Sequence, residues 1–102
     1  MNVTTENMKK EILSKPKAIV DFWAPWCGPC VKFAPIFEKV SKEFPDIVFG
    51  KANIDEENKV AAEFGVMSIP TVAFFVNGTE VGRFTGAISE DSFKSKIHEF
   101  LV

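Results

Sequence analysis

The stretch VDFWAPWCGPC, from Val20 to Cys30, contains both cysteines and both tryptophans of this 102-residue chain. Its start belongs to a short run of β-branched and aromatic residues, Ala18–Trp23. Such a run is typical of a central strand that is covered on both faces. From Cys27 onward the apolar residues instead recur every three or four positions, which predicts an amphipathic helix. We therefore expect both cysteines at a junction where a strand leads into a helix.

Further segments with strand-like or helix-like patterns lie on both sides of this junction. We expect helices at Met8–Leu13, at Cys27–Phe44, at Asp55–Phe64 and from Ser89 onward. Pro45 should end the second helix. The third should have acidic residues in its first turn and should stop at Gly65. The expected strands are Ala18–Trp23, Ile47–Ile54, Pro70–Val76 and Glu80–Thr85, with a hairpin turn at Asn77–Gly78. Alternating strands and helices predict an α/β fold with parallel strand pairs, to which the hairpin adds an antiparallel edge.

The length and composition of the chain favour one compact globular domain over residues 1–102. A formal net charge of −2 gives no electrostatic attraction for nucleic acid or for an anionic membrane, so we expect neither as a partner. The longest apolar runs are too short to span a bilayer. The N-terminal segment MNVTTENMKKEIL lacks the apolar core of a secretory signal, so we expect a cytoplasmic protein.

The spacing of the two cysteines, Cys27-Gly-Pro-Cys30, allows three interpretations. They could be buried free thiols or a structural disulfide, although a bridge that closes so short a loop constrains the unfolded chain only slightly. They could be half of a zinc site, but structural zinc takes four Cys or His ligands and the chain offers one histidine, His98. They could form a redox-active dithiol, which a Cys-x-x-Cys beside an α/β pattern indicates in a cytosolic protein. We favour the dithiol and expect no metal.

The dithiol interpretation has a physical basis in the expected helix. At its N-terminus, unpaired N–H groups and the helix dipole favour the thiolate of Cys27, which is the attacking species in disulfide exchange. Cys30 lies one turn later and can attack Cys27 once a mixed disulfide has formed. Gly28 leaves room for a partner chain, and Pro29 suits the first helical turn. We therefore predict Cys27 as the nucleophile and Cys30 as the resolving thiol.

Two charged residues interrupt the apolar strands around this motif. Asp21 lies inside IVDFW, where it is either an outward-facing or hydrogen-bonded structural carboxylate, or a partly buried acid under the cysteines. In the second case, burial would raise its pKa and let it exchange protons near neutral pH. Lys51 interrupts the neighbouring strand in FGKAN, where an edge lysine with its stem along the surface is the simpler interpretation.

The segment FWAPWCGPC closely resembles the active-site motif of the thioredoxin family. The resemblance extends over nearly the whole chain, because KANID, GVMSIPT, FFVNGTEV and GAIS follow in the order and spacing of that family. It implies the thioredoxin fold, with a central mixed five-stranded sheet flanked by four helices and a first strand near Asn2–Thr4. The chain departs from many relatives at Val31, where a basic or longer side chain is common, and this leaves its partner preference open.

The resemblance also implies roles for residues around the cysteines. Asp21 would accept a proton from Cys30 through water, and Lys51 would modulate Asp21. The bond before Pro70 would be cis, and a shallow apolar surface for an extended target would be formed by Trp26, Gly28, Pro29, Ile69, Pro70, Gly86 and Ala87. The Gly-Pro pair between the cysteines would favour a reducing potential. Trp23 is expected as core packing beneath this surface.

These features imply a thiol–disulfide oxidoreductase that reduces protein disulfides, with no bound cofactor and with Cys27–Cys30 as its redox-active disulfide. The resemblance implies a monomeric electron carrier of cell redox homeostasis, which acts on disulfide-containing target proteins and is recycled by thioredoxin reductase. Two alternatives remain open. One is a disulfide isomerase or oxidant, and the other is a binding subunit that uses the same surface without thiol chemistry.

Overall fold

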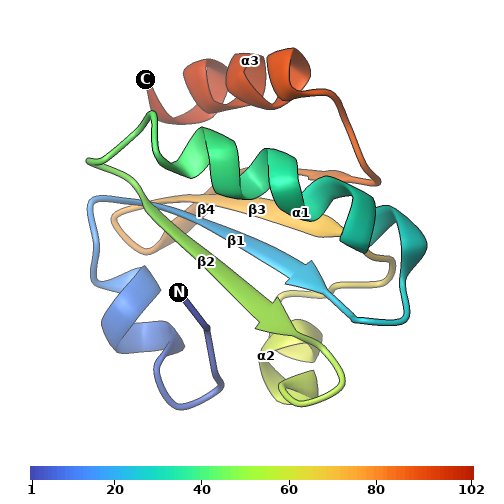
Figure 1. Ribbon diagram of the computed structural model, residues 1–102. Helices are drawn as coiled ribbons and strands as arrows, with labels where there is room; N and C mark the ends of the chain where they lie inside the picture. Colours follow the sequence, from blue (N-terminus) through green and yellow to red (C-terminus); the bar gives the residue numbers. More distant parts are fainter.

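The computed structural model describes residues 1–102 and contains a four-stranded sheet with strand order β2-β1-β3-β4 (Figure 1). The strands are β1 (Lys17–Trp23), β2 (Val48–Asn53), β3 (Thr71–Val76) and β4 (Thr79–Thr85). β1 is central and is buried at five consecutive positions, as its apolar run predicted. It pairs with β2 in parallel and with β3 antiparallel, and β3 pairs antiparallel with β4. The sheet is therefore mixed, and β1–β2 is its one parallel pair.

The expected fifth strand near Asn2–Thr4 does not form. Asn2 makes only an isolated parallel bridge to Lys51, with Val3 N–H donating to the Lys51 carbonyl at 2.8 Å. The pairing stops because the chain turns at once: Thr4 N–H donates to Asn7 Oδ1 at 2.8 Å, and Asn7 N–H donates to Thr4 Oγ1 at 3.0 Å. The prediction of five strands was wrong for this reason, whereas the mixed sheet and the four flanking helices are present.

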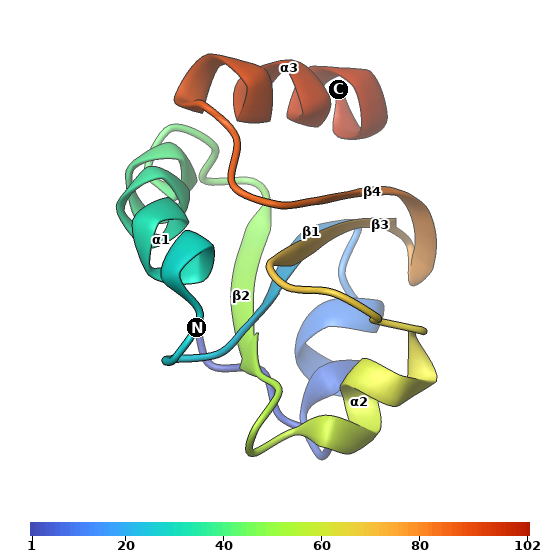
Figure 2. The ribbon, with the colours of Figure 1, turned by 90° about the vertical axis from the view of Figure 1, so that its right-hand side faces the viewer.

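Two layers of helices cover the two faces of the sheet (Figure 2). One face carries α1 (Gly28–Ser41) and α3 (Glu90–Leu101), and the other carries the π-helical turn η1 (Lys9–Leu13) and α2 (Asn58–Glu63). Each face has its own core of eleven buried residues. Phenylalanines fill the α1–α3 side, where the ring of Phe93 packs against the rings of Phe33 and Phe37 at 5.3 and 5.8 Å between centroids.

Two helices are shorter than their patterns predicted. α2 starts at Asn58 because Ile54–Glu56 form a turn, and Glu56 and Glu57 both donate their N–H groups to the Asn53 carbonyl. The three acidic residues therefore precede the helix and do not lie in its first turn. α1 ends at Ser41, since the following residues tighten into bonds between positions i and i−3 ahead of Pro45.

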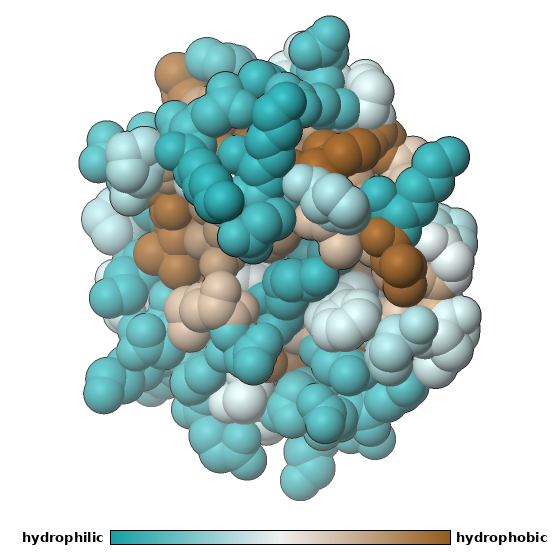
Figure 3. Space-filling model, viewed as in Figure 1, coloured by the Kyte–Doolittle hydropathy of each residue, from teal (hydrophilic) through white to brown (hydrophobic).

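The hairpin turn and the last helix follow their sequence signals. Asn77 and Gly78 have φ angles of +49° and +82°, the left-handed conformations that a two-residue turn between twisted strands requires. Ser89 caps α3 by accepting a hydrogen bond from Ser92 N–H at 3.1 Å. No helix combines the length and the apolar character needed to cross a membrane. On the face drawn in Figure 3 the surface is mostly hydrophilic and its apolar patches are small.

Candidate active site

The two cysteines lie where β1 passes through a short loop into α1. Cys27 is the N-cap of α1, and its Sγ accepts a hydrogen bond from the N–H of Cys30 at 3.2 Å. The two residues form a disulfide with their Cα atoms 5.2 Å apart. Cys27 is 7% exposed and Cys30 is 0% exposed, so only the first sulfur can be reached from solvent. The geometry therefore distinguishes an outer sulfur from an inner one.

The helix start around the disulfide favours negative charge on Cys27. The sulfur lies beside unpaired backbone N–H groups and at the positive end of the helix dipole. Pro29 occupies the first turn, where its missing N–H costs no hydrogen bond. Gly28 is exposed, and a Cβ added to it would meet no atom within 4 Å. The front of the disulfide is thus open to another chain.

Asp21 is fully buried in the middle of β1, so the outward-facing alternative is wrong. Neither carboxyl oxygen has a hydrogen-bond partner within the protein. Burial away from water raises the pKa of Asp21 from 3.8 to about 7, against a smaller lowering by the positive charge of Lys51. A carboxyl group with this pKa can gain or lose a proton near neutral pH.

Lys51 is the register partner of Asp21 in the parallel pairing of β1 with β2. The side chain is half-buried, and its ammonium group forms no ion pair within 4.0 Å. The Nζ atom instead lies 4.5 Å from the centre of the Trp23 ring. The strand register therefore places Lys51 opposite Asp21, while its charge lies over an aromatic face.

The loop before β3 approaches the disulfide from the other side. The peptide bond between Ile69 and Pro70 is cis, and the Ile69 carbonyl oxygen lies 3.9 Å from Cys27 Sγ. Neither the N–H nor the carbonyl of Ile69 makes a backbone hydrogen bond. Pro70 is buried, and its carbonyl accepts from Gly86 N–H at 2.8 Å. The unpaired backbone at Ile69 is available to an extended chain that reaches Cys27.

Trp26 projects from the loop between β1 and α1 and is 68% exposed. Its indole N–H donates to both carboxylate oxygens of Asp55, at 3.1 and 2.9 Å. Sequence reasoning missed Asp55, because no local pattern connects two residues that lie 29 positions apart. It also missed Met67, an apolar residue that is 95% exposed two positions before Ile69. On the far side, Gly86 adopts a φ of +85° and Ala87 is exposed.

His98, the third Cys or His ligand that the chain could offer, is on the C-terminal helix. His98 is in the last turn of α3, where its ring packs edge-on against Phe44 with 6.0 Å between centroids. No group of three or more His, Cys, Asp or Glu side chains is arranged to hold a metal ion. The donor set therefore does not fit the zinc half-site that the cysteine spacing had left open.

Comparison with known proteins identifies the family. The thioredoxin family model matches residues 1–99. The chain is 42% identical to the thioredoxin of Rickettsia prowazekii, over 96% of this chain and 95% of that protein. It is 38% identical to thioredoxin 1 of Synechococcus elongatus, over 97% of this chain and 94% of that protein. It is 36% identical to the thioredoxin of Chlorobaculum thiosulfatiphilum, over 96% of this chain and 93% of that protein.

These matches cover the strand–loop–helix junction together with the rest of the sheet. The Cys27–Cys30 pair is at disulfide distance, as a reversible dithiol requires. Because the family model and the relatives span nearly the whole chain, the protein is a thiol–disulfide oxidoreductase that belongs to the thioredoxin family.

Proposed function

We propose that the protein reduces disulfide bonds of other proteins, with Cys27 as the nucleophile and Cys30 as the resolving thiol. The Cys27 thiolate attacks one sulfur of the target disulfide, the target S–S bond breaks, and one target thiolate leaves. The Cys30 thiolate then attacks Cys27 Sγ and releases the second target thiolate. The target gains two electrons, and the protein is left with its Cys27–Cys30 disulfide.

The observation that carries this proposal is the unequal placement of the two sulfurs. Cys27 is partly accessible at the N-terminus of α1, whereas Cys30 is fully buried. A target can therefore reach Cys27 first, and the thiolate is favoured there by the helix N-terminus. Cys30 acts only within the mixed disulfide, because its sulfur faces Cys27 and not solvent. Gly28 and Pro29 between them would tune the potential toward reduction.

Asp21 is the proposed proton acceptor for Cys30. A thiol must lose its proton before it attacks, and a buried thiol cannot pass that proton directly to bulk water. A buried carboxylate with a pKa of about 7 is a suitable base at neutral pH. Lys51, opposite Asp21, would favour the ionised carboxyl and so modulate this transfer.

The proposed docking surface for the target surrounds Cys27. An extended target segment would pair with the free backbone groups of Ile69 in the manner of an added strand. Apolar or small residues on three loops and at the start of α1 would contact its side chains: Trp26, Gly28, Pro29, Ile69, Pro70, Gly86 and Ala87. The exposed Met67, two positions before Ile69, would extend this surface.

The proposed cycle needs a partner that returns two electrons to the Cys27–Cys30 disulfide. We infer that this partner is a thioredoxin reductase and that the protein acts as a monomeric electron carrier in the cytoplasm. The recycling can be tested by coupling reduction of the oxidised protein to a thioredoxin reductase and its electron donor. No loss of the Cys27–Cys30 disulfide would count against this part of the proposal.

The test of the proposed function is an insulin reduction assay with single cysteine variants. Cys30→Ser should accumulate a mixed disulfide with the target, because resolution is blocked after attack by Cys27. Cys27→Ser should neither reduce insulin nor trap it. Equal trapping by both variants would refute the assigned roles.

Two further measurements test the alternative functions. A redox titration that placed the potential of the Cys27–Cys30 pair near that of strong oxidants would favour the oxidant or isomerase alternative. Full biological function of the variant with both cysteines replaced by serine would favour the binding subunit.

A further inference from the structure

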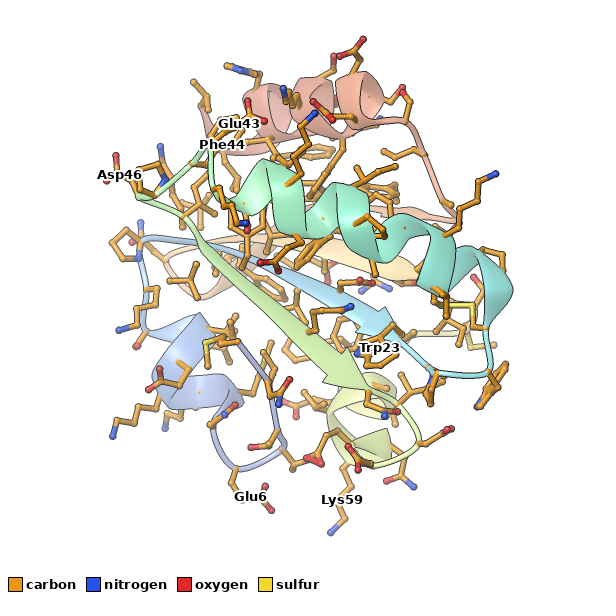
Figure 4. The ribbon with its side chains drawn as sticks, viewed as in Figure 1. Glu6, Trp23, Glu43, Phe44, Asp46 and Lys59 are labelled. Atoms are coloured by element: carbon orange, nitrogen blue, oxygen red, sulfur yellow. A yellow bond between two sulfur atoms is a disulfide. The ribbon has the colours of Figure 1, made fainter.

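Three side chains with different chemistry share one face of the sheet beside the disulfide. Trp23 is the last residue of β1 and lies two positions after Asp21, so both side chains point to the same face. Lys51 pairs with Asp21 across the parallel ladder, and paired residues also share a face. Figure 4 shows Trp23 at the C-terminal end of β1. The strand register therefore places the Asp21 carboxyl, the Lys51 ammonium and the Trp23 indole next to one another on this face.

The ammonium group of Lys51 has several possible anionic partners but pairs with none. Asp21 lies opposite it on β1, and Glu56 and Glu57 line the same cavity of about 240 Å³ as Lys51 and Trp23. No carboxylate oxygen lies within 4.0 Å of Lys51 Nζ. The charged N-terminus does not offer a competing positive charge near Asp21, because it donates to the Phe49 carbonyl of β2 at 3.0 Å.

The indole ring is the group that the Lys51 ammonium does contact. Its Nζ lies 4.5 Å from the ring centre, well within the range of a cation–π interaction. A lysine side chain has four rotatable bonds, and a free ammonium would move toward water. An ammonium held on the ring stays partly buried at the edge of the cavity, where its charge reaches the carboxyl through protein and not through bulk solvent.

We propose that Trp23 is a positioning residue, whose indole face holds the Lys51 ammonium beside Asp21 without letting the two charges pair. This rests on the proposed role of Asp21 as a proton acceptor. A direct ion pair with Lys51 would lower the pKa of Asp21 and keep the carboxyl ionised at neutral pH. A solvated lysine would leave the effect of burial on that pKa unopposed. The ring keeps Lys51 between these extremes, so that the carboxyl gains and loses its proton near neutral pH. Trp23 thereby has a role beyond core packing.

The test measures the pKa of Asp21 in the oxidised protein by NMR titration of its carboxyl carbon. Four proteins are compared: the parent, Lys51→Met, Trp23→Leu and the double variant. Lys51→Met should raise the pKa of Asp21 in the parent background, because a positive charge is lost. In the Trp23→Leu background, Lys51→Met should raise the pKa of Asp21 by at most about half as much as in the parent. The reason is that the ammonium is no longer held near the carboxyl in that background.

Each Lys51→Met protein is compared with the protein that differs from it only at Lys51. Both carry the same residue at position 23, so the effect of any water that Trp23→Leu admits cancels. Equal rises in the two backgrounds would overturn the proposal. If Trp23→Leu does not fold, Trp23→Phe replaces it. The phenyl ring binds a cation more weakly than the indole, so Lys51→Met should raise the pKa of Asp21 less in this background than in the parent. An equal rise would again overturn the proposal. Lys59→Met is the matched control, because Lys59 is exposed on α2 and points away from the molecule (Figure 4).

The readout is a titration and not a rate of disulfide reduction, so it can fail independently of the proposed function. If Asp21→Asn left resolution of the mixed disulfide unchanged, the proton-acceptor role would be refuted while the coupling between Trp23 and Lys51 could still be measured. If Asp21 transfers the proton but the two rises are equal, only the positioning role of Trp23 is refuted.

Discussion

The exposed indole of Trp26 is tied to Asp55 by a hydrogen bond from one N–H to both carboxylate oxygens. The ring is 68% exposed, so packing does little to hold it. Asp55 lies in the turn between β2 and α2, and Trp26 lies in the loop before α1. The hydrogen bond thus fixes an aromatic side chain of the proposed docking surface from a different part of the chain.

We expect Asp55→Ala to weaken target binding by releasing Trp26. Loss of one hydrogen bond to a charged group should raise KM for insulin roughly three- to tenfold with little change in kcat. Steady-state reduction kinetics check this. Glu56→Ala is the control, because the indole N–H donates to Asp55 and not to this neighbouring acid. A similar rise in KM for both variants would mean that local negative charge, and not the orientation of Trp26, is responsible.

Asp21→Asn should slow resolution of the mixed disulfide more than its formation. The amide cannot accept the proton of Cys30, so we expect resolution at pH 7 to fall roughly tenfold or more. Formation depends on the Cys27 thiolate at the helix N-terminus and should change less. Stopped-flow kinetics with a single-turnover target separate the two steps. Equal slowing of both would contradict the assignment of Asp21 to Cys30.

Asp21→Ala should stabilise the oxidised protein increasingly as pH rises. The pKa of Asp21 is about 7 in the folded state and near 4 in the unfolded state, so ionisation costs native stability. The cost is absent below about pH 4, grows through neutral pH and is complete above about pH 8. The difference between variant and parent should therefore change by up to about 4 kcal/mol across this range. Urea unfolding at several pH values measures it, and a pH-independent difference would rule out the raised pKa.

Gly78→Ala should destabilise the protein more than Gly65→Ala. Both glycines have positive φ, +82° and +64°, which costs any side chain about 1–2 kcal/mol. At Gly78 an added Cβ would also lie 2.7 Å from the Leu13 carbonyl oxygen, whereas at Gly65 it would meet nothing within 4 Å. We expect losses of roughly 2–4 kcal/mol and about 1 kcal/mol in the free energy of unfolding. Equal losses would show that the contact with Leu13 relaxes freely.

The local sequence predicted the elements that depend on neighbouring residues. The apolar run before Trp23 marked a buried strand, the three- and four-residue spacing after Cys27 marked α1, and Asn77–Gly78 marked the hairpin. Helix ends were predicted less well, because α2 and α1 are shortened by backbone hydrogen bonds in their flanking turns. The expected strand at Asn2–Thr4 failed for a similar reason, since the Thr4–Asn7 turn leaves only one bridge to Lys51.

By itself, the sequence determined the thiol chemistry, because the Cys-Gly-Pro-Cys spacing and the helix start are properties of adjacent residues. Only the tertiary structure decided the environment of that chemistry. It buried Asp21, placed Lys51 over Trp23, brought Ile69 to within 3.9 Å of Cys27 and tied Trp26 to Asp55. The physical reason is that burial, strand register and contacts between distant loops depend on how the elements pack, and hydrophobic periodicity reports only which face of an element is apolar.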